Sequence, residues 1–331
     1  MSSFLSPLIY IYFLMFGTFI SISSSSIFGI WLGLEINLMS FIPMIINSDQ
    51  NKKSSEAAVK YFLIQAMASA IILFSSLMFI MYSSNMISFI PNLMMTMALG
   101  MKLGMAPLHF WFPETMEGLN WINSMILLTW QKISPLIIMS LLFNSTTLIF
   151  LALSSALIGA ISGLNQTSLR KILSYSSISH LGWMNSIMYM NNEMWLIYFL
   201  IYSIMSIILC LSFFTLSLNY FSQLIYMNNM KKKIMIFINL LSMGGMPPLL
   251  GFLPKWTSIL ILNKNFPILM MLIISSLITL YFYTRLCFST FTLYNPELLW
   301  NYKEMSKKST LLSIMTLISI LSLSPTLYLI L

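Results

Sequence analysis

Charged side chains are scarce in this chain. Only 7% of its 331 residues are Asp, Glu, Lys or Arg, whereas 58% are hydrophobic, and the mean hydropathy is +0.88. So few charges cannot cover a soluble surface, which indicates an integral membrane protein. The net charge of +8 is spread over short loops rather than carried by a basic folded domain, so it does not indicate binding to nucleic acid.

Cysteine and cofactor-binding motifs are equally sparse. The two cysteines, Cys210 and Cys287, are far apart in the sequence, which excludes a disulfide framework and a cluster held by four thiolates. No segment resembles a phosphate-binding glycine loop, a zinc site or a nucleophile triad. We therefore expect this chain to bind no NAD, FMN, iron-sulfur cluster or metal ion by itself.

Long apolar stretches fill most of the chain and predict an all-α, polytopic membrane fold. About 20 apolar residues are needed to cross the hydrocarbon layer. Cutting the chain at its polar clusters gives eleven such stretches, at 4–22, 27–46, 57–81, 86–111, 120–143, 146–163, 168–190, 194–218, 234–262, 266–293 and 310–331. No Lys or Arg precedes the first stretch, so we expect it to be retained as a helix rather than cleaved as a signal or transit peptide.

The cationic loop residues predict the orientation in the membrane. Ten of these residues fall in or beside loops that follow even-numbered stretches, and Lys264 alone is expected on the other side. This asymmetry places the N-terminus on the inner side and the C-terminus outside. Lys60 and Arg285 lie in the parts of their helices nearest the side of the membrane that carries the cationic loops, so we expect them to be interfacial anchors. The ten residues are Lys52, Lys53, Arg170, Lys171, Lys231, Lys232, Lys233, Lys303, Lys307 and Lys308.

Two of the stretches contain residues that break helices. Pro107 interrupts the fourth, and Pro247 and Pro248 interrupt the ninth. Unpaired backbone at membrane depth is tolerated where it is buried in protein or lines a water-filled cavity, and paired breaks mark transporter sites. The alternative is a packing kink, because Gly100 and Gly104 also suit close helix contact.

The two breaks lie five helices apart, which predicts two five-helix repeats of inverted orientation. Within a single membrane domain over 1–331, residues 1–26 form an extra first helix. Residues 27–165 then form the first repeat and residues 166–331 the second.

Four ionisable side chains fall inside the predicted spans: Glu35, Lys102, Lys132 and Lys255. A charge at membrane depth costs roughly 2.5 to 3.5 kcal/mol even on lenient insertion scales, so its presence indicates an ion or proton path. Burial disfavours a charged lysine and a nearby carboxylate favours it, so movement of Glu35 relative to Lys102 would switch proton binding. The alternative is a static buried ion pair between these two residues.

His180 lies in the middle of the seventh span. Because imidazole titrates near neutral pH, His180 is a candidate relay residue in the second half of the chain. A hydrogen-bonded core histidine is the alternative.

Several motifs, in order along nearly the whole chain, resemble those of the chain 2 family of mitochondrial NADH:ubiquinone oxidoreductase (respiratory complex I). They are Trp31–Asn37, Lys102–Glu114, Trp130–Pro135, Gly163–Thr167 and Gly244–Trp256. The resemblance implies an antiporter-like subunit of the inner-membrane arm. It also implies that Glu35, Lys102, Lys132 and Lys255 match the charged residues of the family's proton path.

The resemblance further implies a location in the mitochondrial inner membrane, with the N-terminus in the matrix and the C-terminus in the intermembrane space. The partners would be other complex I subunits, especially neighbouring antiporter-like subunits, and membrane lipids. NAD, FMN, iron-sulfur clusters and ubiquinone would be used by other subunits. A stand-alone cation/proton antiporter and a scaffold that only links membrane subunits remain alternatives.

Overall fold

A computed structural model describes residues 2–48, 51–81, 89–142, 145–190, 193–227 and 229–292, together with Ser313, Thr316 and Leu317. The described part is helical, and its only extended pairing is the isolated bridge between Ser168 and Tyr220. The helices are α1 Ser2–Ser23, α2 Ile27–Ser48, α3 Lys52–Met81, α4 Phe89–Leu103, α5 Trp111–Gly118, α6 Trp121–Leu128, α7 Trp130–Leu141, α8 Ser145–Gly163, α9 Leu169–Tyr189, α10 Trp195–Leu216, α11 Phe221–Ile225, α12 Met230–Gly244, α13 Phe252–Leu262 and α14 Phe266–Thr292.

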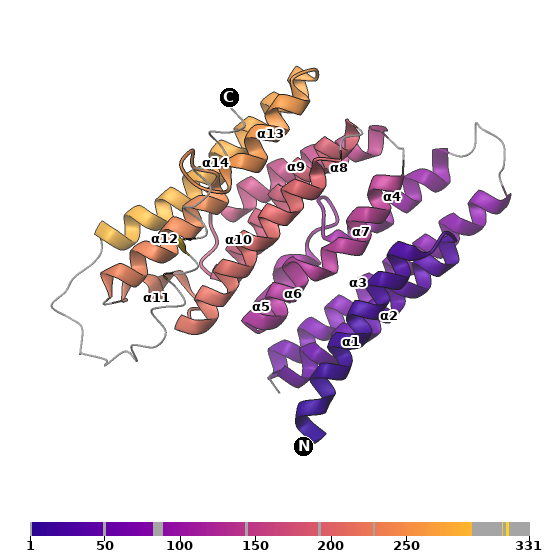
Figure 1. Ribbon diagram of the computed structural model, residues 1–331, viewed down its shortest axis with the longest axis horizontal. Coiled ribbons are helices and arrows are strands. Elements are labelled where there is room, and N and C mark those ends of the chain that lie inside the picture. The colour runs from indigo at the N-terminus through magenta and orange to yellow at the C-terminus, as the bar shows by residue number, and fades with distance from the viewer. Residues whose placement is uncertain are drawn as a thin grey trace. The chain divides into compact units, whose positions relative to one another are not determined.

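The chain forms two compact units, Met1–Leu151 and Ala152–Leu331, which divide within α8. The predicted repeat boundary, at residues 165 and 166, follows α8 instead. In the first unit α2 packs between α1 and α3, α3 contacts α4 and α5, and α7 contacts α4 and α6 (Figure 1). In the second unit α9 contacts α10, α13 and α14, and α12 contacts α10 and α14.

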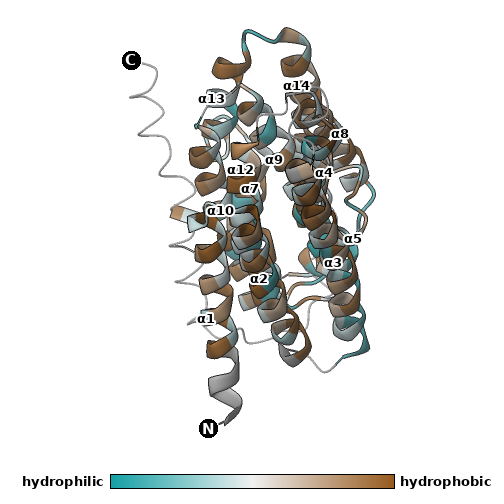
Figure 2. Ribbon diagram, turned by 90° about the vertical axis from the view of Figure 1, so that its right-hand side faces the viewer, coloured by the Kyte–Doolittle hydropathy of each residue, from teal (hydrophilic) through white to brown (hydrophobic). Residues whose placement is uncertain are grey.

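Six of the described helical segments are long and apolar enough to cross a membrane. They are 27–46, 52–79, 121–141, 146–163, 195–216 and 266–292. Shorter apolar helical segments cover 8–23, 89–103 and 252–262. Apolar residues run along the lengths of helices such as α1 and α10 in Figure 2. The total of eleven spans stays a prediction, because apart from residues 313, 316 and 317 the eleventh lies outside the described residues.

The first predicted break lies between α4 and α5. Helix α4 ends at Leu103, and Gly104 adopts a left-handed conformation with φ of 72°. Its N–H donates to Met101 O (3.1 Å), and Met105 N–H donates to Gly100 O (2.9 Å). These two bonds define a Schellman motif, which satisfies carbonyls that the end of a helix leaves unpaired.

The second predicted break, between α12 and α13, has the same local structure. Gly245 has a φ of 83°, and its N–H donates to Ser242 O at 3.0 Å. Met246 N–H donates to Leu241 O at 3.3 Å. A glycine is required at both ends because L side chains are disfavoured at these positive φ values.

The two interruptions also correspond in register. The last residues of α4 and α12, Leu103 and Gly244, are 141 positions apart. Each is followed by a connection of seven residues before the next helix begins. Pro107 lies in the first connection, and Pro247–Pro248 lie in the second. One design of interruption therefore occurs in both units.

A further interruption, which sequence analysis did not predict, divides the expected helix over 120–143 into α6 and α7. Thr129 lies at the junction, with φ of −113° and ψ of −73°. Lys132 N–H donates to Thr129 O, three residues earlier, at 3.3 Å. Pro135 has no N–H to donate to Gln131 O, and its ring crowds that carbonyl. The disturbed turn therefore lies just before the proline and contains Lys132.

Lys231, Lys232 and Lys233 occupy the first turn of α12 rather than a loop. The Lys233 side chain is fully buried, and its Nζ donates to Ile225 O (3.1 Å) and Thr290 O (3.2 Å). The Ile225 carbonyl lies at the C-terminal end of α11, where a positive charge is favourable. Lys233 thus joins the start of α12 to the end of α11 and to α14.

We predict that Gly104→Ala destabilises the protein. The left-handed backbone would cost the alanine about 1–2 kcal/mol. In addition, the new Cβ would lie 2.9 Å from Phe112 Cβ. Thermal unfolding of the detergent-solubilised protein should therefore occur at a lower temperature. Gly100→Ala is the matched control, because its Cβ meets only the flexible end of Leu151 at 3.3 Å. Equal melting temperatures for the two variants would contradict this account of the interruption.

Candidate functional site

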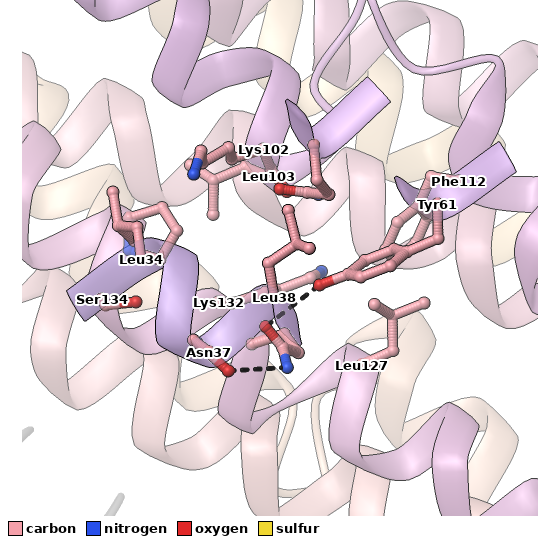
Figure 3. Close-up of a pocket in the computed structure, with 13 residues that line it drawn as sticks. Leu34, Asn37, Leu38, Tyr61, Lys102, Leu103, Phe112, Leu127, Lys132 and Ser134 are labelled. Carbon is pink, nitrogen blue, oxygen red and sulfur yellow. Dashed lines mark hydrogen bonds between the residues drawn. The ribbon is translucent and has the colours of Figure 1, made fainter. Parts of the chain in front are cut away.

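Lys102 and Lys132 line one small cavity in the first unit (Figure 3). The space open to the centre of a water molecule is about 20 Å³. A buried water needs roughly 10–15 Å³ by this measure together with two to four polar partners, so the cavity has room for about one water. Its lining is contributed by Leu34, Asn37, Leu38, Tyr61, Gln65, Lys102, Leu103, Phe112, Leu127, Gln131, Lys132, Ser134 and Pro135.

Lys102 lies in the last turn of α4, immediately before the interruption. Its side chain is buried, with 7% of the residue exposed. The end of a helix carries a partial negative charge, which favours an ammonium group in this turn. Gln65, on α3, donates from Nε2 to the Lys102 backbone oxygen at 3.2 Å. The helix end that carries Lys102 is thereby tied to α3.

Lys132 lies in the first turn of α7, directly after the interruption at Thr129. Only 2% of the residue is exposed. Its Nζ lies 5.1 Å from the centroid of the Phe112 ring, within the range of a cation–π interaction. Phe112 belongs to α5, the helix that follows the interruption of α4. The interruption between α4 and α5 and the interruption at Thr129 therefore place an aromatic face and a buried lysine on the same cavity.

A chain of polar side chains frames the cavity and joins three helices. Gln131 on α7 donates from Nε2 to Asn37 Oδ1 on α2 at 2.9 Å. The Tyr61 hydroxyl on α3 lies 3.4 Å from Gln131 Oε1, a long hydrogen bond that completes the chain (Figure 3). Asn37 and Tyr61 are both buried. Because the Gln131 side-chain amide forms hydrogen bonds with both Asn37 and Tyr61, it fixes the turn of α7 that carries Lys132.

Glu35, the predicted partner of Lys102, lies on α2 beside the cavity and is only half-buried. It acts electrostatically on both Lys102 and Tyr61. Among the described residues, however, Glu35 forms no ion pair with Lys102 within 4.0 Å. The structure therefore lacks this direct contact, and the relay stays a prediction.

A direct ion pair joins Lys60 on α3 to Glu114 on α5. Lys60 Nζ lies 2.6 Å from Glu114 Oε2, and the two side chains are 49% and 53% exposed. Such exposed pairs contribute little to stability, because water screens the two charges. Lys60 was predicted to be an interfacial anchor, and its pairing with Glu114 was not predicted.

Lys255 and His180, the two candidates in the second half of the chain, both lie in the second unit. Lys255 is in the first turn of α13, and its Nζ donates at 2.8 Å to the backbone oxygen of Gly244, the last residue of α12. His180 is buried in α9, and its Nδ1 lies 2.9 Å from the Tyr198 hydroxyl. Neither residue lines the cavity of the first unit.

The structure thus adds Asn37, Tyr61, Gln131 and Phe112 to the site. Asn37 and Gln131 belong to the same short motifs as Glu35 and Lys132, which was the available sequence signal. The side-chain contacts between α2, α3 and α7 could not be read from one sequence.

Over the described residues, no group of three or more His, Cys, Asp or Glu side chains is arranged to hold a metal ion.

Interrupted helices with buried lysines define the class as an antiporter-like membrane protein, and comparisons with known proteins agree. Residues 24–280 match the family described as NADH:quinone oxidoreductase/Mrp antiporter, transmembrane. A solved structure of respiratory complex I from Thermus thermophilus contains a chain with the same fold, with a TM-score of 0.85 at 20% identity. The match covers 97% of this chain and 79% of that one.

Closer relatives share the name NADH-ubiquinone oxidoreductase chain 2. The Anopheles gambiae protein is 46% identical, and the match covers 94% of this chain and 94% of that protein. The Locusta migratoria protein is 43% identical, over 96% of this chain and 94% of that protein. The chain therefore belongs to the NADH:quinone oxidoreductase/Mrp antiporter family of membrane proteins.

We predict that Asn37→Ala and Gln131→Met act on one interaction. Each substitution leaves a partner of the hydrogen-bonded chain unsatisfied, which costs up to roughly 1–3 kcal/mol where that partner is buried. The double variant should lose less stability than the sum of the two single losses, because both remove the same bond. Thermal unfolding of the four proteins in the cycle measures this coupling. Strictly additive losses of stability would contradict the prediction that both substitutions remove the hydrogen bond between Asn37 and Gln131.

Proposed function

We propose that this chain is a core membrane-arm subunit of a proton-translocating NADH:ubiquinone oxidoreductase. It provides an intramembrane relay of Glu35, Lys102, Lys132 and Lys255 that moves protons while electrons pass from NADH to ubiquinone elsewhere in the complex. The family match and the shared name of the relatives support the assignment to the complex. The cavity shared by Lys102 and Lys132 is the observation that carries the relay.

The relay requires that neighbouring lysines hold protons in turn. One water in the cavity would accept a proton from the Lys102 ammonium as it donates another to the neutral Lys132 amine. No net charge is created in this step, because one lysine becomes neutral as the other becomes charged. The reverse transfer occurs when Lys132 carries the proton and Lys102 is neutral. Room for about one water keeps the transfer short.

Glu35 supplies the control over this transfer. A carboxylate close to an ammonium favours the proton-holding state of the lysine, and removal of that carboxylate favours release. Because Glu35 is only half-buried and is not in direct contact with Lys102, its distance to the lysine is free to change with conformation. Conformational or electrostatic signals from quinone reduction elsewhere would act on this distance.

Lys255 and His180 continue the relay in the second half of the chain. Lys255 donates to a carbonyl at the interrupted end of α12, so the break itself provides the polar partner of a buried ammonium. The carbonyls of such an end lack partners within their own helix. Lys102 also lies next to a helix interruption, which it precedes.

The chain carries no redox chemistry in this proposal. NAD, FMN, iron-sulfur clusters and ubiquinone are bound by other subunits. Neighbouring antiporter-like subunits and lipids of the mitochondrial inner membrane would contact the apolar outer faces of the helices. The charge bias of the loops supports a matrix N-terminus and a C-terminus in the intermembrane space.

We predict that Lys102→Met lowers the initial rate of proton translocation roughly tenfold or more, because it removes a group that exchanges protons in the pathway. The measurement is NADH-driven acidification of vesicles that contain the assembled complex. Lys264→Met is the matched control, because Lys264 is an exposed residue of the connection between α13 and α14. Native translocation by an assembled Lys102→Met complex would overturn the relay.

A second experiment tests the assignment to the complex. We expect the chain to migrate with a large NADH-oxidising band when gently solubilised mitochondrial membranes are separated by native electrophoresis. Mass spectrometry of the excised band identifies peptides of this chain, and the in-gel stain reports NADH oxidation. Migration as a small separate species would instead support a stand-alone cation/proton antiporter.

A further inference from the structure

The hydroxyl of Ser134 on α7 has no hydrogen-bond partner among the described residues, although the residue is completely buried. Ser134 lines the cavity of the first unit together with Lys102 and Lys132 (Figure 3). We infer that this hydroxyl holds the water of the cavity. Ser134 is then a positioning residue for proton transfer between the two lysines, an inference that rests on the proposed function.

Other completely buried serines use their hydroxyls differently. Ser124 on α6 and Ser155 on α8 each donate to the backbone oxygen three residues earlier, at 2.7 and 3.0 Å. A helix commonly satisfies a buried serine in this way. Ser134 forms no such bond to Gln131 O in the described part of the chain. The hydroxyl is therefore not committed to its own helix and is left to the cavity that it lines.

A buried hydroxyl without a partner is unfavourable, and most buried polar atoms in proteins bond either to the protein or to ordered water. The cavity has room for about one water. A buried water needs two to four polar partners, and Ser134, Lys102 and Lys132 supply three. The side-chain amides of Gln65 and Gln131 are engaged with neighbouring helices. The serine hydroxyl is thus the lining group whose hydrogen bonds remain for the water.

A hydroxyl suits this role because it can donate or accept, and its proton rotates to suit the partner. In one direction the water accepts a proton from Lys102 and donates another to Lys132, and in the reverse direction the two lysines exchange roles. The water keeps one O–H and one lone pair for Ser134 in either case. Ser134 itself neither gains nor loses a proton. An alanine methyl group offers the water no hydrogen bond in either orientation.

Ser134→Ala tests this inference because it removes one oxygen from the cavity wall. We expect proton translocation by the assembled complex to fall roughly fivefold, which corresponds to the loss of one hydrogen bond of about 1 kcal/mol. Ser124→Ala is the matched control, because Ser124 is equally buried but bonds within its own helix and does not line the cavity. This control should translocate at the native rate. Native electrophoresis verifies that each variant assembles to the native level.

Two further variants separate the hydroxyl from the volume of the side chain. Ser134→Thr keeps the hydroxyl and should translocate close to the native rate. Ser134→Cys keeps nearly the same volume but offers only a weak hydrogen-bonding thiol, so its rate should fall towards that of Ser134→Ala. If Ser134→Thr does not assemble, the comparison of Ser134→Cys with Ser134→Ala decides.

Three results would overturn the inference. Native translocation by Ser134→Ala would mean that the hydroxyl holds no water of the pathway. A native rate for Ser134→Cys would mean that filling the space is sufficient. An assembled Ser134→Thr complex that translocates no faster than Ser134→Ala would show that the hydroxyl does not restore the step.

These outcomes are distinguishable from failure of the proposed function itself. The inference fails and the relay stands if Lys102→Met abolishes translocation while Ser134→Ala does not alter it. The proposed function fails if Lys102→Met translocates normally, whatever the effect at Ser134.

Discussion

The burial of lysine ammonium groups at membrane depth is the constraint on which this structure depends. Placing such a group at membrane depth costs several kcal/mol unless polar groups of the protein or water replace its hydration. The chain meets this requirement with helix ends. Lys102 lies in the last turn of α4, Lys255 donates to the last residue of α12, and Lys132 follows the disturbed turn at Thr129. Each lysine is therefore next to backbone that a continuous helix would not offer.

This placement has a consequence for proton movement. A lysine locked into a close ion pair would hold its proton, because separating the charges in a low dielectric is costly. Lys102 instead feels Glu35 at a distance and shares a polar cavity with Lys132. Phe112 offers an aromatic face to Lys132, an interaction weaker than a buried ion pair. In the proposed relay, both lysines exchange protons through this cavity.

Much of this arrangement could be predicted from the sequence, for identifiable reasons. Charges in apolar stretches and prolines within spans are local signals, so Lys102, Pro107 and Pro247–Pro248 could be located without a structure. The interruption at Thr129 could not, since a proline is tolerated in many helices and its effect depends on what packs against the preceding turn. Gln131 contacts Asn37, 94 positions away in the sequence, and Tyr198 contacts His180, 18 positions away. Such pairings depend on how helices pack, which hydropathy does not determine.

The most direct test of the relay is a high-resolution electron-microscopy map of the assembled complex that resolves water. The account predicts one ordered water in the cavity within hydrogen-bonding distance of Lys102 or Lys132, with Glu35 more than 4.0 Å from the Lys102 ammonium, as in the structure described here. A dry cavity together with a direct Glu35–Lys102 ion pair would contradict it, because that arrangement holds the proton in place.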